Sequence, residues 1–272
     1  MSFFTEGLLH LTKALKVLAG FRLDHLNYSR DNLITPAMSF DKTLDPLTWR
    51  FGGVWDIIRE LALYAQVSRG ADPLGSIITL SLFESEFKLA TAQQYEAGLK
   101  TRLLDGRVEA TLAGYYIVKK NLLTTDPADS NVTLQIGKQS SYGVEMAVGF
   151  RPLPQLAINA NLALLDAQFD RFTEEDAGGV LVSRRGKQPP DVPELVANLW
   201  AVYALTPRWR LGGGLRHVGE RFADTANTVR EPPYTLFDAF LTYAPARFVN
   251  LTLRGRNLTD EAYAIAAYGP RS

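Results

Sequence analysis

The chain has 272 residues, is 46% hydrophobic, and carries 29 Lys plus Arg against 29 Asp plus Glu. This composition is typical of a chain that folds, and the balanced charge gives no overall field that would attract nucleic acid. Cysteine is absent, which excludes disulfides, zinc–thiolate sites and cysteine catalysis. No run approaches the roughly 20 apolar residues that a membrane helix needs, so a helical membrane protein is excluded while a β-barrel is not.

Apolar and polar residues alternate with period two along much of the chain, which predicts strands with two unlike faces. The clearest run is "VEATLAGYYIV" (108–118), where Val108, Ala110 and Leu112 share one face and Glu109 and Thr111 share the other. The same alternation occurs in the runs 15–24, 95–103 and 142–150. About 12 such strands of roughly 9 to 15 residues are predicted, each with one apolar face.

Short and long connections alternate between these strands. Short turns are predicted near Thr12-Lys13, Arg59-Glu60, Asp105-Gly106, Pro152-Leu153-Pro154, Thr206-Pro207 and Pro245-Ala246, and long loops over 30–45, 69–92, 123–132, 168–191 and 221–232. A compact soluble domain rarely tolerates several structureless loops beyond about 12 to 15 residues. Short turns at one rim and long loops at the other are typical of outer-membrane barrels.

The pattern therefore predicts an all-β fold, an antiparallel up-and-down transmembrane β-barrel in the bacterial outer membrane. Aromatic residues near the strand ends are typical of the girdles that such barrels place at the membrane interfaces. These residues are Trp49, Trp55, Tyr64, Tyr95, Tyr142, Trp209, Tyr234 and Tyr243. The alternative is a large soluble β-sandwich or solenoid, in which the apolar faces meet in a core.

Five stretches, taken in order, resemble successive barrel strands of TonB-dependent siderophore receptors. They include "QQYEAGLKTRLLDGRVEATLAGYYIVKK" and "NLTDEAYAIAAYGPR", and they cover 47–73, 93–127, 136–150, 186–203 and 257–271. The resemblance implies a barrel of about 22 strands whose lumen is filled by an N-terminal plug domain. It also implies that a ferric siderophore binds at the outer mouth and that energy arrives through a plug segment that contacts TonB.

Set against this family, residues 1–272 are expected to form the C-terminal portion of the barrel, without the plug, roughly the first nine strands, or the final strand. The side on which the chain ends are expected also indicates a fragment. Complete barrels have an even number of strands and begin and end on the periplasmic side. Here both ends of the chain are expected at the outer rim. A sheet open at both edges leaves backbone groups that hydrocarbon cannot satisfy, so a fragment is expected.

Catalytic motifs are absent from the sequence. The three histidines, His10, His25 and His217, show no metal-ligand spacing, and there is no nucleophile elbow or phosphate-binding glycine loop. The acidic run Glu174–Asp176 lies on a long polar loop and is expected to be solvated. We therefore expect no enzymatic activity, no metal site and no cofactor, with iron carried only inside the siderophore ligand.

Charged residues on the polar faces of the strands are expected to face the lumen and hold the plug by ion pairs and hydrogen bonds. These residues are Arg22, Asp24, Glu96, Lys100, Arg102, Glu145, Arg210, Arg216, Asp238, Arg254 and Arg256.

Ligand capture is assigned to the outer loops, because loops on a rigid scaffold carry recognition. Arginine and aromatic side chains suit bulky, often anionic ferric siderophores. The candidates are Phe83, Phe87, Phe172, Arg184, Arg185, Arg221, Phe222 and Arg230. The alternative for each is that it packs one loop against another.

The function expected is import of ferric siderophores across the outer membrane with energy supplied by TonB. The expected partners are the ferric siderophore, the TonB complex through the plug domain, and outer-membrane lipid, with no nucleic acid. Three alternatives stay open. The substrate could be a vitamin, haem or glycan, the barrel could be a passive porin, or the chain could be a soluble carbohydrate-binding β-domain.

Overall fold

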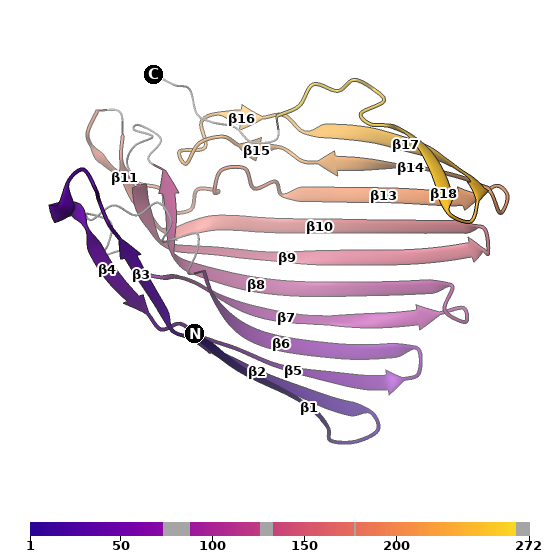
Figure 1. Ribbon diagram of the computed structural model, residues 1–272, viewed down its shortest axis with the longest axis horizontal. Helices are drawn as coiled ribbons and strands as arrows, with labels where there is room; N and C mark the ends of the chain where they lie inside the picture. Colours follow the sequence, from indigo (N-terminus) through magenta and orange to yellow (C-terminus); the bar gives the residue numbers. More distant parts are fainter. Residues whose placement is uncertain (73–87, 126–132, 177, 265–272) are drawn as a thin grey trace.

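The computed structural model describes residues 1–72, 88–125, 133–176 and 178–264. Its main feature is one 12-stranded sheet in which every strand pairs antiparallel with its neighbours along the chain (Figure 1). The strands are β1 (Ser2–His10), β2 (Leu15–Asp24), β5 (Leu47–Ile58), β6 (Leu61–Asp72), β7 (Ala90–Leu103), β8 (Val108–Thr125), β9 (Thr133–Leu153), β10 (Leu156–Arg171), β13 (Leu195–Ala204), β14 (Trp209–Val218), β17 (Tyr234–Ala246) and β18 (Val249–Gly255). The predicted all-β, up-and-down antiparallel fold is confirmed.

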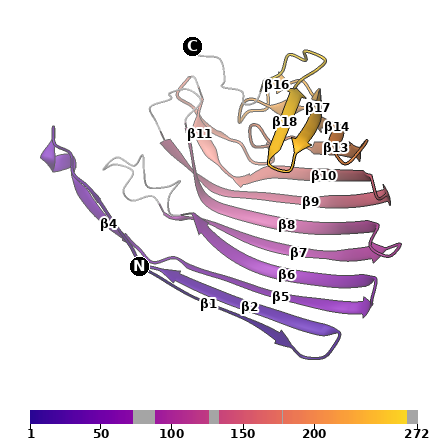
Figure 2. The same ribbon diagram turned by 45° about the vertical axis from the view of Figure 1, so that its right-hand side comes forward.

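Among the described residues, three two-stranded hairpins lie in the long connections. They are β3 (Leu26–Arg30) with β4 (Phe40–Leu44), β11 (Thr173–Glu175) with β12 (Leu181–Ser183), and β15 (Arg221–Phe222) with β16 (Arg230–Glu231). A single 3-10 turn, η1 (Pro36–Met38), joins β3 to β4. Figures 1 and 2 show tight turns at one end of the sheet and the hairpins at the other, which we call the long-loop end. The predicted alternation of short and long connections is confirmed.

Two predicted turns are displaced, both at prolines. β9 continues to Leu153, and β17 continues through Pro245 to Ala246. Each strand carries a register shift at that point, because proline cannot donate to the ladder and is accommodated at a bulge. The long loop predicted over 69–92 is also shorter than expected, since β6 and β7 stay paired as far as Asp72 opposite Ala90.

The two faces of the sheet differ in chemistry. Leu112, Met146 and Leu162 stand directly opposite one another across β8, β9 and β10 on one face. Leu112 is 42% exposed and Met146 is 39% exposed, and large exposed apolar side chains continue over the other strands. No second sheet packs on this face among the described residues, as a β-sandwich would require. An extended exposed apolar surface of this kind is typical of a sheet that faces lipid.

The opposite face is polar but holds aromatic rings between β13 and β17. Trp200 and Phe240 stack with their ring centres 6.0 Å apart and their planes 14° apart. They lie over the "LGGGL" segment of β14, where Trp200 is opposite Gly214 and Phe240 is opposite Gly212. A Cβ at Gly214 would contact the Trp200 ring and the carbonyl oxygen of Leu199. Glycine is therefore required there to let the ring lie flat on the strand.

The sheet is curved and open. In Figure 2, β14, β17 and β18 stand at a steep angle to β1 and β2. β1 and β18 form the two edges and do not pair with each other in the described structure. Within the same residues, no helix is long and apolar enough to cross a membrane.

Candidate ligand-binding surface

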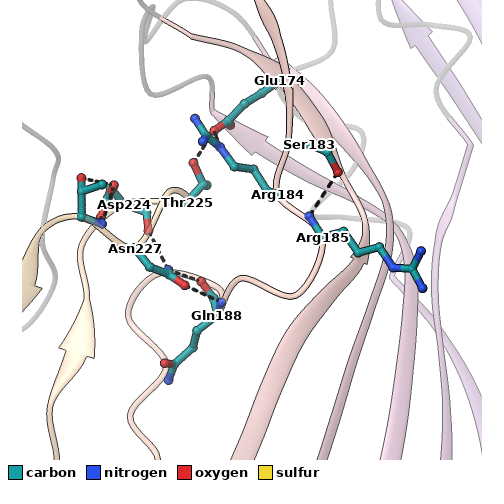
Figure 3. Close-up of polar contacts among 9 residues, drawn as sticks. Glu174, Ser183, Arg184, Arg185, Gln188, Asp224, Thr225 and Asn227 are labelled. Atoms are coloured by element: carbon teal, nitrogen blue, oxygen red, sulfur yellow. Dashed lines mark hydrogen bonds and ion pairs between the residues drawn. The ribbon is translucent and has the colours of Figure 1, made fainter.

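Two of the long connections fold against each other at the long-loop end. We call residues 172–194 and 219–233 the paired loops. The backbone amide of Gln188 donates to Oδ1 of Asn227, and Nδ2 of Asn227 donates back to the carbonyl oxygen of Gln188, both at 2.8 Å. The amide of Asp191 also donates to the carbonyl oxygen of Phe222 at 2.9 Å. Figure 3 shows the reciprocal bonds. These contacts make the two loops one surface.

A buried ion pair lies between the paired loops. Glu174 is 2% exposed, and its Oε1 accepts a hydrogen bond at 2.6 Å from Nε of Arg184. The hydroxyl of Thr225, from the other loop, donates to the same oxygen (Figure 3). The expectation that this acidic run is solvated is therefore wrong for Glu174, although it holds for exposed Glu175. Alternation within the short strand β11 turns the two carboxylates in opposite directions.

Apolar and cation–aromatic contacts complete the packing of the paired loops. Phe172, 3% exposed, packs on Phe169 with ring centres 5.0 Å apart, and Leu122 lies against both. Arg221 is equally buried, 5.7 Å from the ring centre of Tyr234. Its Nε lies 3.4 Å from Oδ1 of Asp191, and its NH2 donates to the carbonyl oxygen of Ala264.

The eight residues proposed to bind ligand fall into three groups. Phe83 and Phe87 lie outside the described residues. Phe172, Arg184 and Arg221 are used inside the paired loops as described above. Arg185, Phe222 and Arg230 are more accessible: the side chain of Arg230 is 65% exposed, 5.2 Å from the ring centre of Phe222, and pairs with Glu220. Figure 3 shows the side chain of Arg185 directed away from Glu174. A ligand role for any of them stays a prediction.

The turn within the second loop is held by one carboxylate that sequence reasoning did not single out. Asp224 accepts hydrogen bonds from the amides of Thr228 and Val229 at 2.8 and 2.9 Å, and from the Thr228 hydroxyl at 2.7 Å. Burial raises the pKa of Asp224, but these hydrogen bonds outweigh burial and leave the pKa below its usual value. Asp224 followed by polar residues is a common turn sequence, which was the available signal.

Replacing Asp224 with alanine should lower the free energy needed to open this turn by about 2 kcal/mol, because two amides and a hydroxyl lose a charged acceptor. A carboxyl whose folded pKa is lowered contributes stability that is complete above the unfolded pKa of about 3.9 and is lost as pH falls through the lower folded value. Hydrogen exchange at Thr228 and Val229, corrected for intrinsic rates, should therefore stay slow down to about pH 4 and accelerate below it. An unchanged exchange rate in Asp224→Ala would contradict this assignment.

All of the residues proposed to face the lumen fall on the polar face of the sheet. The ladder places Glu96 opposite Tyr115, Lys100 opposite Thr111, and Glu145 opposite Ala113. The same register places the remaining residues of that set on this face, with Arg256 directly after β18: Arg22, Asp24, Arg102, Arg210, Arg216, Asp238 and Arg254. Their contact with a plug stays a prediction.

Some of these charges already have partners within the sheet. Glu96 accepts hydrogen bonds from Tyr64 at 2.7 Å, Gln94 at 2.7 Å and Gln66 at 3.1 Å. Arg22 pairs with Asp24, and Arg102 pairs with Glu109, both at 2.9 Å. In contrast, four arginines are exposed and form no ion pair with the described residues. They are Arg210, Arg216, Arg254 and Arg256.

A curved antiparallel sheet with an exposed apolar face, a charged face, tight turns at one end and long loops at the other defines the wall of an outer-membrane β-barrel. Residues 1–258 match the family model described as TonB dependent receptor-like, beta-barrel, and the chain belongs to this family. The expected receptor class and outer-membrane location are confirmed. The family consists of transport receptors.

Several relatives are named as receptors for siderophores or for metal-pseudopaline, and one is named as a vitamin B12 transporter. The metal-pseudopaline receptor CntO of Pseudomonas aeruginosa is 29% identical over 235 residues, which are 85% of this chain and 32% of the receptor. The probable TonB-dependent siderophore receptor PiuA of Acinetobacter baumannii is 25% identical over 262 residues, 92% and 35% of the two chains. The crystal structure of PiuA superposes with a TM-score of 0.82 at 23% identity and covers 98% of this chain and 40% of that one. The chain thus spans about a third of the length of these relatives.

Proposed function

We propose that this chain forms barrel wall and outer loops of an active transporter that imports ferric siderophores with energy from the TonB complex. The observation that carries the proposal is the pair of loops fixed to each other at the long-loop end of a receptor-family barrel wall. Loops held in one shape present a defined binding surface at low entropic cost. Several relatives are named as siderophore receptors and one as a vitamin B12 transporter, which favours a siderophore over a vitamin, haem or glycan.

In this proposal, some of the eight candidate residues contact the ligand and others support the shape of the loops. Arg185, Phe222 and Arg230 offer the cationic and aromatic groups that suit an anionic iron chelate. Phe172, Arg184 and Arg221 act indirectly, because Phe172 and Arg221 are buried, Arg184 is paired with buried Glu174, and all three hold the shape of the paired loops. Phe83 and Phe87 keep their proposed ligand role on sequence grounds alone.

The polar face of the sheet is proposed to hold a plug domain. Its exposed arginines are available for carboxylates of such a domain, since they form no ion pair within the described structure. The charges that are already paired, such as Glu96 with its three donors, keep fixed positions for a second partner. The role is structural and requires no catalytic group or cofactor.

The test is uptake of iron-55 by an iron-starved strain that lacks the gene encoding this chain, compared with the same strain carrying the gene. A panel of purified ferric siderophores, with cyanocobalamin and haem as rival substrates, identifies the cargo. Saturable, gene-dependent uptake of one ferric siderophore that disappears when tonB is deleted is the expected result. Gene-dependent uptake that survives tonB deletion and does not saturate would instead indicate a porin.

A further inference from the structure

An aromatic row crosses the apolar face near the long-loop end. Tyr95, Tyr116 and Tyr142 stand directly opposite one another on β7, β8 and β9. They are between 41% and 56% exposed, and the Tyr142 hydroxyl donates to Asp166 at 2.8 Å. Tyrosines at one level on the lipid face mark the boundary between hydrocarbon and headgroups. The outer headgroup layer therefore begins at this row.

Three cations lie on the same face, beyond the tyrosine row toward the long loops. Lys120 follows Tyr116 by four residues, and Lys138 precedes Tyr142 by four, which is ~13 Å along each strand. Arg69 lies opposite Gln93, two residues beyond Tyr95. Even spacings keep a side chain on one face of a strand, so all three cations face the membrane side at headgroup level.

The placement of these cations is unfavourable unless an anion joins them. Lys120 and Lys138 are directly opposite in the β8–β9 ladder, and like charges in that position destabilise a sheet. Asp170 pairs with Lys138 at 3.2 Å and offsets one charge. Lys120 and Arg69 are exposed and have no ion pair in the described structure.

A groove of about 850 Å³ joins the cations to the tyrosines. Its lining includes Arg69, Lys120 and Lys138 together with Tyr95 and Tyr116. Asp45 also lines the groove but is paired with His25 at 2.6 Å. The groove is thus basic toward the long-loop end and aromatic on its other side. The exposed apolar face of the sheet continues beyond the aromatic part.

We propose that this groove binds the phosphorylated headgroup of an outer-leaflet lipid, with a phosphate between Arg69, Lys120 and Lys138 and the acyl chains along the apolar face. A phosphate relieves the Lys120–Lys138 repulsion and accepts several charge-assisted hydrogen bonds. Lipopolysaccharide, the outer-leaflet lipid of bacterial outer membranes, carries such phosphates on its lipid A. The site rests on the membrane location of the sheet and not on the identity of the imported substrate.

The test compares wild-type protein with Arg69→Gln/Lys120→Gln, using the whole protein that the gene encodes, purified in detergent. Binding of bisphosphorylated lipid A is measured by native mass spectrometry. Each lost charge should weaken binding about fivefold, or about 30-fold for the double variant. The matched control is Lys119→Gln, because Lys119 is also exposed but turns to the opposite face of β8. It should bind as wild type does.

Two further arms separate the possible sources of phosphate and the effect of misfolding. Dephosphorylated lipid A should bind wild type about 30-fold more weakly than bisphosphorylated lipid A does. This comparison uses wild-type protein alone, so it holds even if the double variant fails to fold. Free inorganic phosphate at the same concentration should not displace the lipid. Equal binding of the two lipids, displacement by free phosphate, or equal losses in the Lys119 and Arg69/Lys120 variants would overturn the proposal.

Discussion

Replacing Glu174 with alanine should detach the paired loops from each other while leaving the sheet intact. Glu174 is almost fully buried, and its removal leaves Arg184 and Thr225 without their shared acceptor. Removing one partner of a buried pair costs about 3 to 5 kcal/mol. If opening is fast relative to cleavage, proteolysis within residues 172–194 and 219–233 on intact cells should become roughly 100- to 4,000-fold faster. Uptake of the cargo should fall with the fraction of closed loops.

Neighbouring variants distinguish loss of this ion pair from a general effect on the loop. Glu175→Ala removes an adjacent, exposed carboxylate and should leave cleavage within about twofold of wild type, since exposed charges contribute little. Arg184→Ala should match Glu174→Ala, and the double variant should cost less than the sum of the two. Similar cleavage rates in Glu174→Ala and Glu175→Ala would show that the buried pair does not hold the loops.

The sheet was predictable from the sequence because the apolar–polar pattern that specifies each strand is local. Alternation over ten or so residues fixes which side chains share a face, and this placed all of Glu96, Lys100, Arg102 and Glu145 correctly on the polar face. Where a turn was displaced, a proline was the cause. Proline usually ends a strand, but Pro245 lies within β17, at an irregularity in the ladder. Local pattern cannot foresee that the proline is accommodated at a bulge within its own strand.

The packing of the loops was not predictable, because its contacts join residues far apart in the sequence. Glu174 meets Thr225 across 51 positions, and Gln188 meets Asn227 across 39. β11 is only three residues long, too short for an alternation pattern to show that Glu174 turns inward and Glu175 outward. For the same reason the sequence did not show that Arg184 and Arg221 form ion pairs within the paired loops, with Glu174 and Asp191.

Replacing Gly214 with alanine should prevent normal folding of the sheet around β13, β14 and β17. The added Cβ would overlap both the Trp200 ring and the Leu199 carbonyl oxygen. The ring can move only by losing its stacking on Phe240, and the carbonyl belongs to the paired strand and cannot move without breaking the ladder. Overpacking costs about 1 to 3 kcal/mol, and backbone overlap places this variant at the upper end. The folded fraction, measured by heat-modifiable migration on gels, should fall sharply.

Gly213→Ala is the matched control, one residue away on the other face of the same strand. A Cβ there would lie 3.4 Å from the carbonyl oxygen of Asp238 and 3.8 Å from Cβ of Ala239, which are ordinary contacts. Because glycine inside a strand costs about 0.5 to 1 kcal/mol relative to alanine, this variant should be neutral or slightly stabilising. A contrast between adjacent glycines follows only if one face of β14 is crowded by rings and the other is open to lipid. Equal behaviour of the two variants would therefore contradict the assignment of faces on which the lumen and membrane sides both depend.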